Sequence, residues 1–183
     1  MDLELKGRVA IVAASSLGLG KAVALGLARE GVRLALCART ESTLQAAADE
    51  IRRATGAEVM ACALDVTVYS SVCQFVAAVH KQFGRLDICV ANAGGPPSKL
   101  FAETTIEDWQ GAANLNLMST VYFAKEVLPR MREQRWGRFI AITSVAAKQP
   151  VDGLILSNAV RAGVSGLIKL NRCRTNTAPT VCW

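Results

Sequence analysis

The stretch from Arg8 to Ala28 constrains the fold more than any other part of the chain, because three local patterns follow one another in it. Val9 to Ala14 is an apolar run typical of a buried strand. A turn of small residues follows. Lys21 to Arg29 then carries apolar residues at helical spacing, with Gly31 where a helix should stop. A strand, a glycine-rich turn and a helix in this order are typical of an α/β protein.

The turn has the local form of a site for a dinucleotide phosphate. It lets backbone N–H groups approach a pyrophosphate, and the helix that follows presents its positive dipole end there. The spacing is not the commonest dinucleotide fingerprint, so the turn alone is equally compatible with a tight strand-to-helix connection. The residues concerned are Ala14, Ser15, Ser16, Leu17, Gly18, Leu19 and Gly20.

Strands and helices alternate five times along the chain, and the strands are apolar throughout, which is typical of a parallel sheet covered on both faces. We therefore predict a doubly wound three-layer α/β sheet of the Rossmann type, in the strand order 3-2-1-4-5. Pro129 should kink or end the third of the later helices. Later strands are expected at Arg33–Cys37, Glu58–Leu64, Asp87–Ala91 and Gly137–Ile142, and later helices at Glu41–Thr55 (capped by Thr40 or Glu41), Tyr69–Phe83, Ile106–Arg135 and Leu154–Leu170.

Length and composition predict one cytoplasmic globular domain, residues 1–170, followed by an irregular tail, residues 171–183. A chain of 183 residues with 51% hydrophobic and 20% charged residues has the size and composition of a single domain. No apolar run approaches the roughly 18 residues of a membrane span. The start, MDLELKGR, carries acids where a signal peptide would be basic and then apolar.

Neither a metal site nor a nucleic-acid partner is indicated. The six cysteines form no CxxC pair, and Cys37, Cys62 and Cys89 fall in predicted strands, where a free thiol behaves as a small core residue. The single histidine, His80, lies on a predicted helix beside Lys81, as expected for a solvated side chain. The net charge of +6 is attributed to scattered solvent-facing lysines and arginines.

Polar residues follow the ends of the predicted strands, where ligands bind in a doubly wound sheet. Arg39 comes just after the second strand, and an arginine there suits a ribose 2′-phosphate, whereas an acidic residue would accept from a 2′-hydroxyl. Arg39 thus favours NADP, the alternative being a solvated surface arginine. Asp65 ends the third strand, Asn92-Ala93-Gly94 the fourth and Thr143-Ser144 the fifth.

In these pieces the chain resembles the short-chain dehydrogenases/reductases, in the branch that includes the 3-oxoacyl-carrier-protein reductases. The resemblance runs from about Leu5 to Leu170. It rests on the turn from Ala14 to Gly20, Asp65-Val66, Asn92-Ala93-Gly94, Asn116 and Ser144.

The resemblance implies hydride transfer between a nicotinamide cofactor and a small carbonyl compound or secondary alcohol. It implies adenine contacts by Asp65 and Val66, and stabilisation of the central sheet and the cofactor region by Asn92. It also implies a proton-relay water held by Asn116 and a substrate carbonyl bound by Ser144. Family oligomers pack through the helices that correspond to Ile106–Arg135 and Leu154–Leu170.

The chain departs from the family pattern at two places in the site. Ala14 replaces the first glycine of the turn, which is tolerable if its φ is negative. Ser157 and Arg161 stand where the family has Tyr-xxx-Lys. A serine hydroxyl is a much weaker acid than a phenol, and an arginine cannot deprotonate to act as a base. Arg161 is expected to hold a nicotinamide ribose or a substrate carboxylate. This Ser-Asn-xx-Arg pattern, with Gly94-Gly95-Pro96-Pro97, looks like a divergent branch.

The end of the chain is the other departure, because family members continue with at least one further strand and helix. We expect a truncated or frame-shifted reading frame, and a sheet that is incomplete at this end. The tail should then not pair as a strand, and Arg138 to Ile142 should form an apolar sheet edge. The helix from Leu154 to Leu170 should leave an apolar face in water, so the chain should be poorly stable and prone to associate.

Three functions remain open at this stage. The first is an NADP-dependent oxidoreductase of the short-chain type. The second is a nucleotide-binding module without turnover, which the missing tyrosine favours. A methyltransferase with the same strand, turn and helix is disfavoured, because it would want an acidic residue where Arg39 stands.

Overall fold

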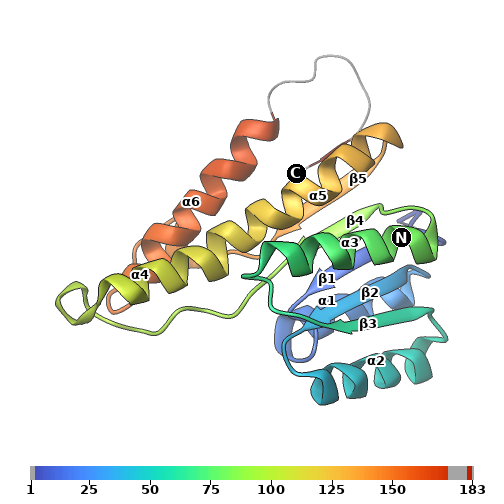
Figure 1. The fold of residues 1–183 in the computed structure, drawn as a ribbon, viewed down its shortest axis with the longest axis horizontal. Helices are drawn as coiled ribbons and strands as arrows, with labels where there is room; N and C mark the ends of the chain where they lie inside the picture. Colours follow the sequence, from blue (N-terminus) through green and yellow to red (C-terminus); the bar gives the residue numbers. More distant parts are fainter. Residues whose placement is uncertain (1–2, 173–180, 183) are drawn as a thin grey trace.

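The computed structural model describes residues 3–172 and 181–182, which form a parallel sheet with helices on both faces (Figure 1). The strand order is β3-β2-β1-β4-β5-β6, so the predicted order of the first five strands is confirmed. The strands are β1 (Val9–Ala13), β2 (Arg33–Ala38), β3 (Val59–Ala63), β4 (Ile88–Ala91), β5 (Gly137–Ala141) and β6 (Val181–Cys182).

The helices follow the predicted periodicity, with shifts of a few residues at some ends. Two short 3₁₀ turns, Phe101–Glu103 and Val145–Ala147, lie in loops that leave the sheet. The α-helices are α1 (Gly18–Arg29), α2 (Glu41–Thr55), α3 (Tyr69–Phe83), α4 (Ile106–Ala112), α5 (Ser119–Glu133) and α6 (Ile155–Arg172).

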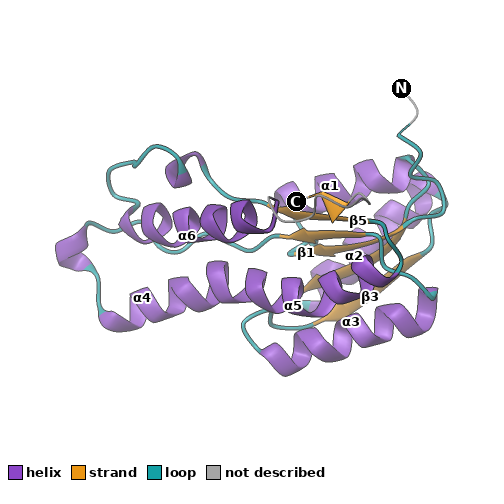
Figure 2. Cartoon of the chain, turned by 90° about the horizontal axis from the view of Figure 1, so that it is seen from above, coloured by secondary structure: helices purple, strands orange, loops and turns teal. Residues whose placement is uncertain are grey.

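Alternate residues of the strands face two separate cores, as the pleat of a strand requires. Val9 and Ile11 of β1 pack against α3 and α5, whereas Ala10 and Val12 pack against α1 and α2. Figure 2 shows the sheet between the layer with α1 and the layer with α3 and α5. Because both faces are covered, β1, β2 and β4 are buried along nearly their whole length.

The helix predicted over Ile106–Arg135 consists of three segments. α4 is followed by a π-helical segment, Ala113–Met118, and then by α5. Pro129 lies inside α5, which continues to Glu133, so the helix does not end at the proline. The helix ends before Arg135, whose φ of 54° is incompatible with its continuation.

The tail differs from the prediction in two respects. Val181 and Cys182 pair in parallel with Gly137 and Arg138 of β5, so the expectation that no tail residue pairs as a strand is wrong. An unpaired edge presents backbone N–H and C=O groups that any extended segment can satisfy, and this segment does so. α6 also extends to Arg172, two residues past its predicted end. The rest of the predicted tail, residues 173–180 and 183, lies outside the described residues.

Part of the expected apolar exposure is present on β5. Ile140 is 48% exposed although its partner in β4, Val90, is 1% exposed. The β6 pairing reaches only the first two residues of β5. Within residues 3–172 and 181–182, no helix has the length and apolarity needed to cross a bilayer.

The cysteines and the histidine lie as predicted. Cys37 and Cys89 are buried and Cys62 is half-buried, all as free thiols. Burial raises the pKa of Cys37 to about 12 and the pKa of Cys89 well above its ordinary value, so both thiols stay protonated. His80 is exposed on α3. No group of metal-binding side chains occurs among the described residues.

Candidate functional site

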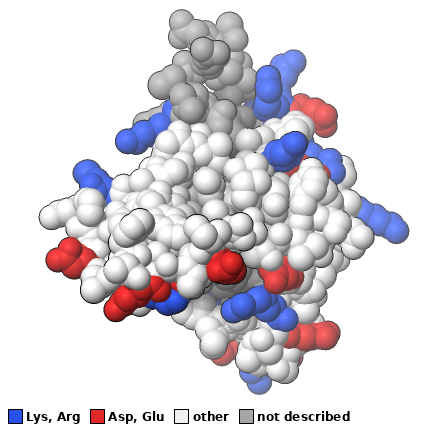
Figure 3. All heavy atoms as spheres, turned by 60° about the vertical axis from the view of Figure 1, so that its left-hand side comes forward, with Lys and Arg blue, Asp and Glu red and all other residues white. Residues whose placement is uncertain are grey.

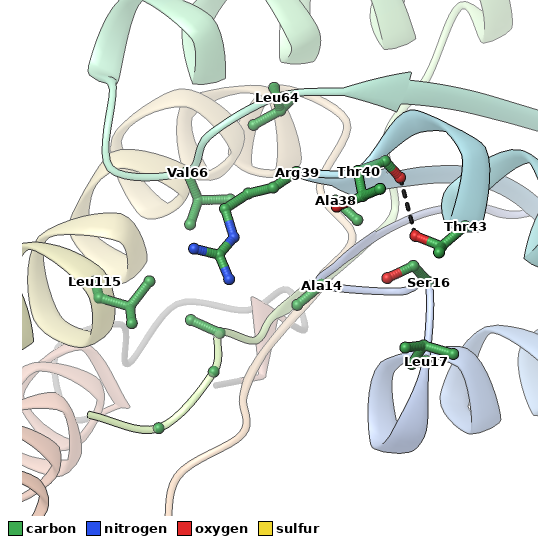
Figure 4. Close-up of a pocket in the computed structure, with 13 residues that line it drawn as sticks. Ala14, Ser16, Leu17, Ala38, Arg39, Thr40, Thr43, Leu64, Val66 and Leu115 are labelled. Atoms are coloured by element: carbon green, nitrogen blue, oxygen red, sulfur yellow. Dashed lines mark hydrogen bonds between the residues drawn. The ribbon is translucent and has the colours of Figure 1, made fainter. Parts of the chain in front are cut away.

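A cavity of about 620 Å³ lies beyond the carboxyl ends of the strands, where a doubly wound sheet binds its ligands. Three loops form it, namely those that follow β1, β2 and β4, together with residues after β3 and on the π-helical segment (Figure 4). Its size falls in the usual range for small-molecule sites. Its lining is Ala14, Ser16, Leu17, Ala38, Arg39, Thr40, Thr43, Leu64, Val66, Ala93, Gly94, Gly95 and Leu115.

The first residue of the turn is strained. Ala14 has a φ of 48°, so the condition of a negative φ is not met. Only glycine adopts this left-handed region freely, because the Cβ of other residues approaches the neighbouring backbone. Gly18, four residues later, has a φ of 56° and carries no such penalty. The turn therefore keeps a backbone shape that suits glycine at both positions while placing alanine at one of them.

Gly20 allows the turn to lie directly on α1. A Cβ atom added at Gly20 would lie 2.2 Å from the carbonyl oxygen of Ala14 and 3.0 Å from Nδ2 of Asn92. Such an approach is possible only without a side chain. Gly20 thus fixes the distance between the turn and the helix, and Asn92 lies beside this contact.

The remaining turn residues differ in exposure. Ser15 is fully buried, and both its backbone N–H and its hydroxyl donate to the carbonyl oxygen of Cys37, at 3.2 and 3.4 Å. These bonds attach the turn to the end of β2. Ser16 and Leu17 line the cavity, and Leu17 and Leu19 are 66% and 68% exposed. Ser15 therefore has a structural role beneath the cavity, and the cavity wall begins at Ser16.

Arg39 supplies the positive charge of the cavity. Its side chain extends from the end of β2 into the space bordered by Val66, Leu115 and Ala14 (Figure 4). It forms no salt bridge within the described part of the chain. A guanidinium in this position is free to bind an anionic group of a ligand.

Asp65 lies beside Arg39, at the edge of a smaller adjoining cavity of about 330 Å³. Its Oδ1 accepts from the backbone N–H and the hydroxyl of Thr67, both at 2.8 Å. These bonds lower the pKa of Asp65, and the positive charge of Arg39 lowers it further. Asp65 therefore holds its loop in a fixed shape as a carboxylate, and Val66 presents an apolar side chain to the main cavity.

Sequence reasoning missed several residues of the cavity wall. Thr40 and Thr43 follow Arg39, and the Thr43 hydroxyl donates to the Thr40 carbonyl oxygen at 3.1 Å. Their place at the start of α2, directly after a strand end, is the signal that would have identified them. Leu115 carries no such signal, because only packing brings it to the cavity.

The carbonyl oxygen of Gly94 joins the cavity to the predicted catalytic residues. It accepts from Nδ2 of Asn116 at 2.8 Å and from Nη2 of Arg161 at 3.5 Å. Arg161 also donates from Nη1 to the carbonyl oxygen of Ile142 at 2.9 Å. The structure thus brings Asn116 and Arg161 to one backbone atom of the cavity wall.

Asn116 lies within the π-helical segment and is only 4% exposed. Its Oδ1 is buried without a hydrogen-bond partner among the described residues. A buried acceptor of this kind requires a donor from water or a ligand. Single π-helical turns are frequent at functional sites, which agrees with this position.

Ser144 and Ser157 form no hydrogen bond with each other. The Ser144 hydroxyl accepts from the backbone N–H of Ala146 at 3.2 Å and begins the 3₁₀ turn after β5. Ser157 is 7% exposed on α6, and its hydroxyl forms no hydrogen bond within residues 3–172. Burial lowers the pKa of Arg161, yet a guanidinium is so weak an acid that it stays protonated at neutral pH.

The residues present fit a dinucleotide. The turn, the amino end of α1 and the close packing at Gly20 form a cradle for phosphate groups. Arg39 offers a cation to a further phosphate, and the unpaired Oδ1 of Asn116 offers an acceptor near the end of β4. The strained Ala14 shapes this cradle without closing it.

The chain is similar in sequence to bacterial reductases and oxidoreductases. It is 35% identical over 165 residues to a 3-oxoacyl-[acyl-carrier-protein] reductase of Synechocystis sp., covering 90% of this chain and 67% of the relative. It is 33% identical over 165 residues to an uncharacterized oxidoreductase of Staphylococcus saprophyticus, covering 90% of this chain and 70% of the relative.

Solved structures share its fold. L-sorbose reductase from Gluconobacter frateurii, complexed with NADPH and L-sorbose, matches with a TM-score of 0.91 and 33% identity. That match covers 94% of this chain and 65% of the reductase. An NADPH-bound short chain oxidoreductase from Pseudomonas aeruginosa with an atypical catalytic center matches with a TM-score of 0.87 and 31% identity, covering 90% and 65% of the two chains.

The chain thus spans about two thirds of the length of these proteins. The family model described as short chain dehydrogenase matches residues 8–178, from the start of β1 past the end of α6. Together with the fold and the glycine-rich turn, this match shows that the chain belongs to the short-chain dehydrogenase/reductase family of oxidoreductases.

Proposed function

We propose that the protein is an NADP-dependent oxidoreductase that transfers hydride between the nicotinamide and a small carbonyl compound or secondary alcohol, as a 3-oxoacyl reductase does. The observation that carries the proposal is the guanidinium of Arg39, which lines the cavity next to the glycine-rich turn and forms no salt bridge within the described residues. A charge-assisted hydrogen bond from it to a 2′-phosphate would select NADPH over NADH.

Different residues of the cavity wall bind different parts of the cofactor and the substrate. Ser16 and the backbone N–H groups at the start of α1 bind the phosphates, while Val66 and the loop at Asp65 hold the adenine end. Ala93, Gly94 and Asn92 shape the wall after β4. Ser144 orients the substrate carbonyl and Asn116 holds a water with its Oδ1. The cofactor, when bound, supplies the hydride.

Proton transfer is the step for which the site offers the poorest acid–base groups. Ser157 has too high a pKa to donate a proton readily, and Arg161 does not release one. General acid or base groups contribute roughly 10²–10⁴ in rate, so turnover should be slow rather than absent. The absence of the phenol favours a second candidate function, a nucleotide-binding module without turnover. The NADPH-bound Pseudomonas oxidoreductase supports the oxidoreductase function, because it has this fold and an atypical catalytic center and is described as an oxidoreductase.

Titration of the protein with NADPH and NADH, followed by intrinsic fluorescence, tests the cofactor proposal. The expected result is tighter binding of NADPH. Consumption of NADPH is then measured with a panel of ketones and 3-oxoacyl thioesters. Binding with no turnover for any substrate would favour the module without activity, and equal affinity for both cofactors would contradict the role of Arg39.

We also propose that the protein is cytoplasmic and self-associates through α4, α5 and α6. Phe101, in the 3₁₀ turn before α4, and Ile106, the first residue of α4, are 71% and 68% exposed, which supports a contact on this side. Figure 3, which turns the left side of Figure 1 forward, shows a broad area there without charged side chains. The elution volume and light scattering of the purified protein test the association.

A further inference from the structure

The first turn of α6 is fastened to the loop before it by one side chain. Nδ2 of Asn158 donates to the carbonyl oxygen of Val151 at 3.0 Å, and Oδ1 of Asn158 accepts from the N–H of the same residue at 3.2 Å. The amide therefore satisfies both backbone groups of one loop residue, as a neighbouring strand would. Sequence reasoning assigned no role to Asn158.

The loop held in this way connects two walls of the site. It runs from the 3₁₀ turn that follows Ser144 to α6, and Leu154 within it forms a parallel bridge with Lys99. Lys99 lies a few residues beyond Gly94 and Gly95, which line the cavity. Fixing Val151 thus also restrains the segment that leaves the cavity wall.

Arg161, one turn further along α6, makes the second fastening. Its hydrogen bonds to Ile142 and Gly94 join the ends of β5 and β4. Arg161 is 8% exposed and forms no salt bridge within the described residues. Its charge is therefore balanced by carbonyl dipoles, and these bonds direct the guanidinium at the backbone rather than toward a substrate carboxylate.

Asn158 and Arg161 are three residues apart and so lie on neighbouring positions of one helix face. Ser157 directly precedes Asn158, lies one helical turn before Arg161 and is buried. A helix held in this way cannot rotate or slide without breaking bonds at Val151, Ile142 and Gly94 together. The position of the Ser157 hydroxyl relative to the cavity wall then depends on both side chains.

We propose that Asn158 and Arg161 are positioning residues, which clamp α6 to the loop at Val151 and to the ends of β4 and β5 and so set the geometry of the substrate side. This inference rests on the proposed function for its consequence in catalysis. Its structural part concerns the chain alone and is testable without cofactor.

The test compares four variants by hydrogen exchange at the amides of Val151 and Ile142. Asn158→Leu removes both bonds to Val151, and Asn158→Asp keeps only the acceptor. Arg161→Met removes the bonds to both strand ends, and Arg161→Lys keeps a cation that reaches one of them. We expect exchange at Val151 to rise about tenfold in Asn158→Leu, which removes the acceptor of the Val151 N–H. The Ile142 N–H donates to the carbonyl oxygen of Ala91, so its exchange reports opening between the ends of β4 and β5, and we expect it to rise about tenfold in Arg161→Met, which no longer joins these ends.

Matched controls and conservative variants keep the test interpretable. Asn114→Leu and Arg29→Met change exposed residues of the same types elsewhere and should leave both amides unaffected. Should Arg161→Met fail to fold, as judged by circular dichroism, Arg161→Lys carries the test with a smaller rise at Ile142. The effect of Asp at position 158 on Val151 should lie between those of Asn and Leu.

A kinetic measurement separates positioning from mere stability. For a carbonyl compound that the parent protein reduces, Asn158→Leu should raise KM about tenfold with NADPH affinity within twofold of the parent. Arg161→Met should also weaken NADPH binding, because Gly94 lines the cavity. Unchanged exchange at Val151 and Ile142, or raised exchange with unchanged kinetics, would overturn the proposal. A parent protein that binds no NADPH would instead refute the proposed function, and the exchange data would still decide whether the clamps exist.

Discussion

The turn after β1 lines the cavity, whereas the first turns of α6 reach it through the hydrogen bond of Arg161 to Gly94, and the two regions depart from the family pattern in different ways. At the turn, one glycine is replaced by Ala14, and the backbone keeps the left-handed shape at the expense of strain. At α6, Ser157 and Arg161 stand where the resemblance implies Tyr-xxx-Lys; Arg161 donates to the carbonyl oxygens of Ile142 and Gly94, and the Ser157 hydroxyl forms no hydrogen bond within the described residues. The turn preserves its geometry, whereas α6 changes the chemistry of its side chains.

The difference shows that the turn depends on its backbone geometry and α6 on the identity of its side chains. Backbone N–H groups bind phosphate at the turn, so their directions matter and the side chain at position 14 matters less. On α6 the family chemistry needs particular side chains, and a substitution there removes a reaction step directly. We therefore expect cofactor binding to be retained in this chain and proton transfer to be impaired.

Restoring the acid–base pair is the change with the largest expected effect. Ser157→Tyr with Arg161→Lys should raise kcat for carbonyl reduction by about 10²-fold, since a phenol beside a cation is a tunable proton donor. The rate of NADPH oxidation at saturating ketone measures it. Ser157→Phe with Arg161→Lys is the control, because it has the same ring without the hydroxyl. Equal rates of NADPH oxidation for the two double variants would show that proton transfer does not limit the reaction.

The cofactor preference at the other side is the next test. Arg39→Asp should reverse the preference for NADPH over NADH, because a charge-assisted bond to a 2′-phosphate contributes roughly 1.5–3 kcal/mol, about ten- to a hundredfold in affinity. Dissociation constants from fluorescence titration check it. Arg53→Asp, an exposed arginine of α2, makes the same charge change away from the cavity. If both variants bind the two cofactors like the parent, Arg39 is a surface residue.

The close packing at Gly20 gives a third test. Gly20→Ala places a methyl group 2.2 Å from the Ala14 carbonyl oxygen, so the turn must move. Overpacking of this kind costs about 1–3 kcal/mol of unfolding free energy, and the displaced turn should bind NADPH more weakly. Gly26→Ala, on the same helix with nothing within 4 Å of the added Cβ, should instead stabilise the protein by about 0.5–1 kcal/mol. Chemical denaturation of both variants measures the contrast.

The sequence predicted the sheet well because local periodicity decides it. Apolar runs bounded by glycine and polar residues specify β1 to β5, and right-handed crossovers then fix their order. The ends of parallel strands meet at one edge, which placed Arg39 and Gly94 at the cavity, and the family resemblance placed Val66 there.

The features it did not predict depend on contacts between distant segments or on backbone angles. The φ of Ala14 is set by the packing of Gly20 against the turn, and no pattern in the residue types reveals its sign. The π-helical segment around Asn116 has an ordinary helical sequence. The β6 pairing joins two residues of the tail to β5, and the clamp at Asn158 needs Val151 to lie across from it.

The smallest effect concerns the strain at the turn. Ala14→Gly should stabilise the fold by about 0.5–1 kcal/mol, because relief of roughly 1–2 kcal/mol of left-handed strain is partly offset by the larger chain entropy of glycine. For a chain of this size that is a rise in Tm of a few degrees. Arg135→Gly is the matched control, since Arg135 has a φ of 54° but lies outside the cavity. Both variants should gain stability, measured by thermal unfolding, while only Ala14→Gly should alter NADPH affinity. If Arg135→Gly raises Tm and Ala14→Gly does not, the turn accommodates alanine without strain. The contrast between a strained turn and an α6 with altered side chains would then not hold for the turn.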